Sequence, residues 1–203
     1  MITININVAG ADLTFLKQNQ YVLCMACREM DMGYDVICFS EKDYLSNNVI
    51  AIFDEYQIFC CKNLIDRKKL MISVGPVDIS MGQKITMSQE GNISQVTGGT
   101  RKDGFEMVND YGAIYPGFGR KIHYQGSEMF LPAFVADCAS VKGTYVLRPD
   151  NRIQVWFEQF VESGVYFSDF SAKIVKAGRS RAMEVILNQD VINLSYQEGN
   201  WIK

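Results

Sequence analysis

Cysteine and histidine are the residue types in this chain that could most readily do chemistry, and the six cysteines come first. They are Cys24, Cys27, Cys38, Cys60, Cys61 and Cys138. Cys24 and Cys27 have the spacing of zinc and redox motifs. Their apolar neighbours favour a β-strand, however, and residues three apart in a strand point to opposite faces. Adjacent Cys60 and Cys61 diverge for the same reason. We therefore expect no metal site and no cofactor.

The surroundings of the cysteines also bear on their oxidation state. Five of the six lie between residues 21 and 61, in apolar runs typical of strands. A chain of 203 residues can bury a full core and needs no disulfides to stabilise it. We expect buried, reduced thiols and a reducing, intracellular site of synthesis.

Hydrolytic triads and acid–base pairs usually recruit histidine, and the chain has only His123. The one catalytic arrangement to consider combines His123 with Cys138, Asp110 or Asp137. No local motif supports it, and a lone histidine in a strand is more often structural. No glycine-rich loop for phosphate is present, since Gly98 and Gly99 are not followed by the required Gly-Lys-Ser/Thr. We expect a protein that is not an enzyme, and keep His123 catalysis as an alternative.

Charge and hydropathy restrict the partners. The formal net charge of −3 gives no overall attraction for nucleic acid or anionic membrane. It also does little to keep copies of the chain apart. The first residues alternate like a strand and do not resemble a signal peptide, and no apolar run is long enough to span a bilayer. We expect a soluble protein made in the cytoplasm, and leave its final location open.

Hydrophobic alternation along the chain predicts the fold class. In residues 152–160, Ile153, Val155 and Phe157 alternate with polar or outward residues, which is the period of a half-buried strand. Similar runs at 165–170, 172–176, 182–187 and 191–196 predict an antiparallel meander. Over the whole chain the pattern predicts an all-β, antiparallel β-sandwich of two packed sheets with roughly 14 short strands. The only helix candidate is a single short turn near residues 11–19, with Asp12 as its N-cap.

The domain organisation is predicted from linkers and strand rhythm. Glycines near residues 98–104 mark the most flexible region, and we considered a boundary there. No long polar linker accompanies them, and strand-like runs continue on both sides. We expect one domain over residues 1–203.

One aromatic segment is the predicted binding site. It contains Tyr111, Tyr115, Phe118, His123 and Tyr124, and residues 111–124 have the pattern of a glycine-rich loop. Aromatic rings with hydrogen-bonding neighbours suit a sugar or a protein partner. The alternative is that these rings fill one end of the core, because aromatic side chains mostly pack.

A second segment, residues 84–97, predicts a hairpin whose outer positions are rich in Ser, Thr and Gln. Pore-forming β-proteins insert hairpins of this kind, and ordinary solvent-facing hairpins have the same pattern.

These observations favour a non-catalytic interaction or self-assembly protein, a homo-oligomer or protein-binding module that presents aromatic loops and edge strands. The alternative is a lectin-like or pore-forming toxin that acts on glycans or membranes at a cell surface.

Overall fold

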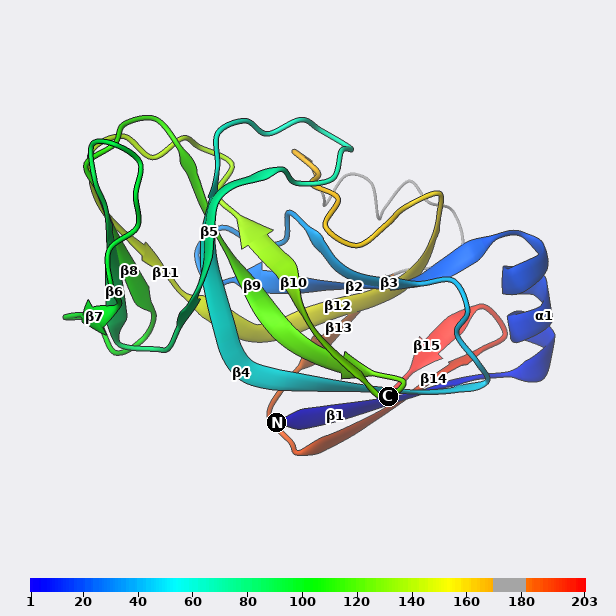
Figure 1. Cartoon of the computed structure of the whole chain (residues 1–203). Helices are drawn as coiled ribbons and strands as arrows, with labels where there is room; N and C mark the ends of the chain where they lie inside the picture. The colour runs from blue at the N-terminus through cyan, green and yellow to red at the C-terminus, as the bar shows by residue number, and fades with distance from the viewer. Residues whose placement is uncertain (170–181) are drawn as a thin grey trace.

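The computed structural model describes residues 1–169 and 182–203, and within them it confirms the all-β prediction. This part of the chain contains fifteen strands and one helix, and the strands form three sheets (Figure 1). The expected number of strands was close, but the expected number of sheets was two. Residues 170–181, which include the predicted strand 172–176 and the last residue of the predicted strand 165–170, lie outside the described part.

The largest sheet has seven strands and joins the two ends of the described chain. Its strand order is β10-β9-β4-β1-β14-β15, and β5 pairs separately with β4. Strand β1 pairs in parallel with β14 and antiparallel with β4. The strands are β1 (Ile2–Val8), β4 (Asn47–Cys61), β5 (Ile72–Ile79), β9 (Tyr115–Tyr124), β10 (Ser127–Val135), β14 (Val191–Gln197) and β15 (Asn200–Ile202).

The second sheet covers the inner side of the first. Its order is β13-β12-β2-β3, and every pairing in it is antiparallel. Ile4 and Ile6 of β1, Leu23 of β2 and Phe157 of β12 belong to one buried cluster, so the core lies between these two layers (Figure 1). The strands are β2 (Tyr21–Glu29), β3 (Ile37–Glu41), β12 (Pro149–Gln159) and β13 (Met183–Ile186).

The third sheet lies at one end of the molecule, on the left in Figure 1. Its order is β11-β8-β6-β7. Ile85, Met107 and Leu147 from this sheet extend the same buried cluster. The core is therefore continuous across the region near residues 98–104, and one domain remains our prediction. The strands are β6 (Gln83–Met87), β7 (Thr97–Gly98), β8 (Phe105–Asn109) and β11 (Gly143–Leu147).

Helix α1 (Gly10–Gln18) follows β1 at the opposite end and is longer than the single turn expected. Its N-cap is Ala9, and the predicted cap, Asp12, lies inside the first turn. The Asp12 carboxylate instead accepts hydrogen bonds from the backbone N–H groups of Glu198 and Gly199, at 2.8 and 3.1 Å. Asp12 therefore anchors the helix to the turn between β14 and β15. No helix in residues 1–169 or 182–203 has the length and apolarity needed to cross a bilayer.

The predicted C-terminal meander is wrong, because its strands go to different sheets. β12 pairs with β2 and β13, whereas β14 pairs in parallel with β1. Val165 and Tyr166 make only isolated bridges, to Lys69 and Val36. Alternation shows which residues face the core, but it carries no information on which strand lies alongside.

Strand β4 is continuous through Asp54 and Glu55, although it bends there. Its pairing with β9 is interrupted between Ile52 and Tyr56. The buried guanidinium of Arg120 fills this gap, and donates to the carbonyl oxygen of Phe53 at 2.9 Å and to Oδ1 of Asp54 at 2.7 Å. Burial by itself disfavours the charge, but Tyr56, Cys27 and Asp54 raise the pKa of Arg120. The two halves of β4 can therefore pair with different strands, β1 and β5.

The glycine-rich segment expected to be a loop is mostly strand β9. Its glycines are explained by close packing. A Cβ atom on Gly117 would lie 2.5 Å from the carbonyl oxygen of Phe134 and 2.6 Å from the ring of Phe59. The glycines between residues 112 and 126 give the sequence the pattern of a turn. In the structure most of this segment is a strand, and its glycines leave room for closely packed neighbours.

Replacing Gly117 with alanine tests this explanation. We expect Gly117→Ala to lower the free energy of unfolding by about 3 kcal/mol, because backbone and ring atoms must move to admit the methyl group. Chemical denaturation monitored by circular dichroism measures the change. Gly98→Ala is the matched control, since a Cβ atom there meets nothing within 4 Å. Equal stabilities of the two variants would contradict the explanation.

Candidate binding groove

The five residues of the predicted aromatic site do not form one open surface. Phe118 and Tyr124 lie on β9 and point into the core. The Phe118 ring contacts the rings of Tyr56, Phe105 and Phe134, with centroids 5.6 to 6.1 Å apart. The Tyr124 hydroxyl donates to Oδ1 of Asn48 at 3.0 Å. These two side chains therefore match the packing alternative.

The other three residues of this set are partly exposed and lie in different places. Tyr111 follows β8, and the Lys62 ammonium lies 5.7 Å from the centre of its ring. Tyr115 packs against a small buried cluster that includes Phe59 and Val135. His123 pairs with Ala51 and Glu128 on neighbouring strands. Binding through these residues stays a prediction, and it would involve separate patches.

The geometry of β9 and β10 separates His123 from its candidate catalytic partners. Val135 pairs with Gly117, which lies six positions before His123 on β9. At about 3.3 Å per residue, His123 is roughly 20 Å from this end of the hairpin. Asp137 and Cys138 continue beyond Val135. Asp110 is also at that end, since its neighbour Asn109 bonds Ser140 at 3.0 Å. The structure does not bring these groups together.

The predicted hairpin at residues 84–97 is present, although it pairs little along its length. Lys84 pairs with Thr97, and Met87 makes an isolated bridge with Ile93. Ile85 and Met87 of β6 are buried in the main core. The apolar face of this segment is therefore covered by the protein itself.

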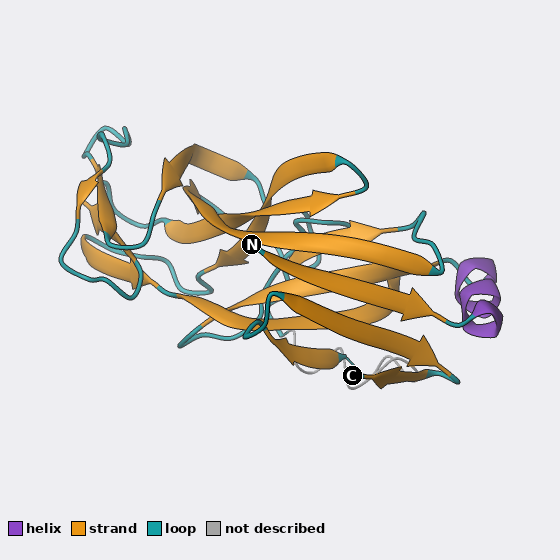
Figure 2. Cartoon of the chain, turned by 90° about the horizontal axis from the view of Figure 1, so that it is seen from below, coloured by secondary structure: helices purple, strands orange, loops and turns teal. Residues whose placement is uncertain are grey.

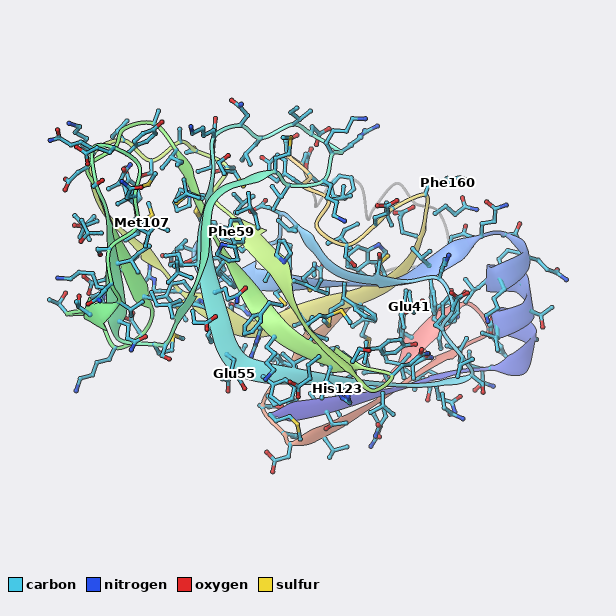
Figure 3. The ribbon with its side chains drawn as sticks, in the orientation of Figure 1. Glu41, Glu55, Phe59, Met107, His123 and Phe160 are labelled. Carbon is cyan, nitrogen blue, oxygen red and sulfur yellow. The ribbon has the colours of Figure 1, made fainter. Side chains whose placement is uncertain are left out.

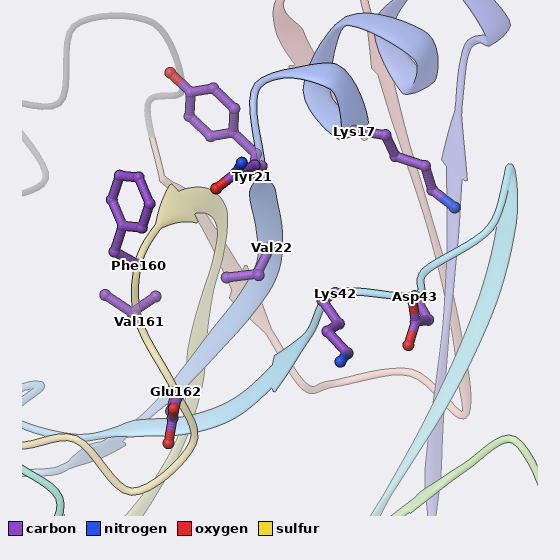
Figure 4. A pocket seen from close by; sticks show the side chains of 9 residues that line it. Lys17, Tyr21, Val22, Lys42, Asp43, Phe160, Val161 and Glu162 are labelled. Atoms are coloured by element: carbon purple, nitrogen blue, oxygen red, sulfur yellow. The ribbon is translucent and has the colours of Figure 1, made fainter.

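A groove that the sequence did not indicate lies between the end of β12, the start of β2 and the end of β3. It has a volume of about 700 Å³ (Figure 4). Phe160, at its rim, is 85% exposed, the most exposed large apolar side chain in the described residues. Figure 3 shows Phe160 on a different part of the molecule from His123. The lining residues are Lys17, Gln20, Tyr21, Val22, Lys42, Asp43, Phe160, Val161 and Glu162.

The backbone at this groove explains how the Phe160 ring is presented. Gln159 and Tyr21 are the last residues paired between β12 and β2. Phe160, which follows Gln159, has a positive φ of 58°, and Gln20, which precedes Tyr21, has a positive φ of 59°. A left-handed conformation is unfavourable for side chains of this kind. The paired strands therefore separate at this point, and Phe160 turns away from the core instead of continuing the strand.

Aromatic rings and charges of both signs line the groove. The Tyr21 ring stacks on Phe15 of α1, with centroids 6.4 Å apart. Lys17 and Lys42 contribute ammonium groups, and Asp43 and Glu162 contribute carboxylates (Figure 4). Such a surface can hold an apolar side chain against the rings and pair charges at its edges.

A group of acidic side chains surrounds Asp35, in the segment before β3. Burial, and then the charges of Asp137 and Glu29, raise the pKa of Asp35 to about 7. Among the described residues, no group of three or more His, Cys, Asp or Glu side chains could hold a metal ion. Asp137 and Glu29 thus act on Asp35 through their charges.

The thiols that are close in sequence point to different sides of their strands, as the strand geometry predicted. Cys24 and Cys27 lie in different buried clusters, and so do Cys60 and Cys61. Cys27 and Cys38 are in contact across β2 and β3, with sulfur atoms 3.3 Å apart. The hydrogen bond between Cys27 and Cys38 lowers the pKa of Cys27, although burial opposes the shift. Only Cys138 is exposed.

Comparison with known proteins found no match for the chain among family models, curated proteins or solved structures. Functional inference therefore depends on the geometry above.

The burial of the thiols predicts their reactivity. We expect a bulky disulfide reagent to modify one thiol rapidly in the native protein, and all six after denaturation, because only Cys138 is exposed. Absorbance of the released chromophore counts the reacted groups. Cys138→Ser should remove the fast phase. A fast phase that persists in this variant would show that a buried thiol is accessible.

The raised pKa of Asp35 predicts a pH dependence of stability. In the unfolded chain an aspartate ionises near pH 4, whereas folded Asp35 ionises near pH 7. The native state thus holds the extra proton between these values, and the free energy of unfolding falls as the pH rises through them. Asp35→Asn should match the parent near pH 4 and be more stable at pH 8. Denaturation curves across pH measure this, and a constant difference would contradict it.

Proposed function

We propose that this protein is a non-catalytic interaction protein that associates with further copies of itself through the groove at Phe160. The observation that carries the proposal is the presentation of Phe160. Its ring is 85% exposed and is held by a left-handed backbone beside Tyr21. The fold itself gains almost no burial from this ring.

The energetics favour a role in binding. Covering a phenylalanine side chain contributes on the order of 2 kcal/mol, and aromatic residues are enriched among the anchors of protein interfaces. Phe15 and Tyr21 extend the apolar area next to the groove. A partner that covers Phe160 would gain the favourable free energy of burying this side chain, which the isolated chain does not gain.

The charges in the groove favour a second copy as that partner. Lys17 and Lys42 lie in the same groove as Asp43 and Glu162. In a two-fold symmetric contact the same patch faces itself, so lysines of one copy can approach carboxylates of the other. The net charge of −3 adds little repulsion between copies.

Sedimentation velocity over a range of protein concentrations tests the proposal. We expect the parent chain to form dimers, and Phe160→Ala to weaken the association roughly ten-fold or more through loss of the central apolar contact. Raising the salt concentration should also weaken it, because the paired charges are near the surface.

Met71→Ala is the matched control, since Met71 is 75% exposed but lies outside the groove. It should associate like the parent. A parent chain that stays monomeric at the highest concentration would refute self-association. Equal loss in both variants would remove the groove from the explanation.

A further inference from the structure

The outer side of the largest sheet carries a second concave surface, lined by uncharged residues of which most are polar. Figure 2 views this side, with the strand that begins at N near its centre. A hollow of about 300 Å³ lies over β14, β1 and β4. We call it the asparagine face, and it is lined by Asn5, Ile6, Asn7, Asn47, Asn48, Val49, Asn193, Leu194 and Ser195.

Strand register brings the asparagines of this face into rows. Asn5 stands between Asn193 on β14 and Val49 on β4. Asn7 stands between Ser195 and Asn47 in the next row. Because residues two apart on a strand share a face, both rows point outward while Ile4 and Ile6 point into the core.

Hydrogen bonds between the side chains fix the orientation of the amides. Asn5 Nδ2 donates to Asn193 Oδ1, and Asn7 Nδ2 donates to Asn47 Oδ1, each at 2.8 Å. In each pair the accepting residue keeps its NH₂ group for a ligand, and the donating residue keeps its carbonyl oxygen. The face therefore presents donors and acceptors side by side on rigid strands, with their positions set before a ligand arrives.

The buried Asn48 supports this arrangement from below. Its side chain accepts from the backbone N–H of Leu45 at 2.7 Å and from the hydroxyl of Tyr124 at 3.0 Å, and donates to the Leu45 carbonyl oxygen at 2.6 Å. These bonds fix the chain where β4 begins, next to Asn47. The start of β4 is thus held firmly against β1.

The composition of the lining points to the ligand class. None of the nine lining residues is ionisable, although 21% of the chain is charged. A phosphate or carboxylate would find no cation here, and an ammonium group would find no anion. Sugar hydroxyls both donate and accept, which matches paired amides, and the half-exposed Val49 offers an apolar contact for ring C–H groups. The hollow is at the small end of ligand sites, which suits one sugar ring.

We propose that the asparagine face binds a neutral saccharide, with Asn5, Asn7, Asn47 and Asn193 as the hydrogen-bonding residues. The site is separate from the Phe160 groove and does not depend on self-association. Because the hollow is shallow and accommodates a single ring, we expect dissociation constants of about 1 mM for simple glycosides.

Titration of isotope-labelled protein with methyl glycosides of glucose, galactose, mannose and N-acetylglucosamine, followed by NMR, tests the proposal. At least one glycoside should shift the side-chain amide signals of the four asparagines. Asn5→Leu combined with Asn193→Leu should weaken that binding at least ten-fold, since the replacements keep the size but remove the amides. Asn151→Leu, at an exposed position on β12, is the matched control and should bind like the parent.

Three outcomes would overturn the proposal. The first is the absence of shifts with every glycoside, and the second is shifts that map away from the asparagine face. The third is a change of these signals with protein concentration alone, which would assign the face to a second copy. Phe160→Ala separates the two proposals, because it should weaken self-association and leave glycoside binding unchanged.

Discussion

The hydrogen bonds of Arg120 at the bend of β4 are the interaction on which the arrangement of the sheets depends. They satisfy the backbone where β4 and β9 lose their register between Ile52 and Tyr56. Because of this bend, one half of β4 pairs with β1 and the other half pairs with β5, both within the largest sheet. A buried guanidinium is expensive to desolvate, and here the Phe53 carbonyl and the Asp54 carboxylate offset that penalty.

Much of the local structure could be predicted from the sequence, and the pairing could not. Alternation in the first residues indicated a strand, and the structure has β1 there, with Ile4 and Ile6 in the core. The same periodicity correctly separated Cys24 from Cys27. Which strands become neighbours is decided by packing and by turns. The residues of β1 and β14 therefore did not indicate that these two strands pair in parallel.

The candidate sites were harder to predict, for two physical reasons. Glycines are chosen both for turns and for close packing, and Gly117 belongs to the second case, so a strand was read as an aromatic loop. Phe160 continues an alternating run, and a phenylalanine there does not indicate a left-handed backbone conformation. Asn5 and Asn193 are 188 positions apart, and only the fold shows that they are neighbours.

The parallel contact between β1 and β14 also constrains how the chain can acquire its fold. The largest sheet cannot be completed until the ribosome has synthesised β14, so the edge of β1 that faces away from β4 has no neighbouring strand until then. Long-range pairing of this kind makes folding slow and leaves strand edges open in the meantime.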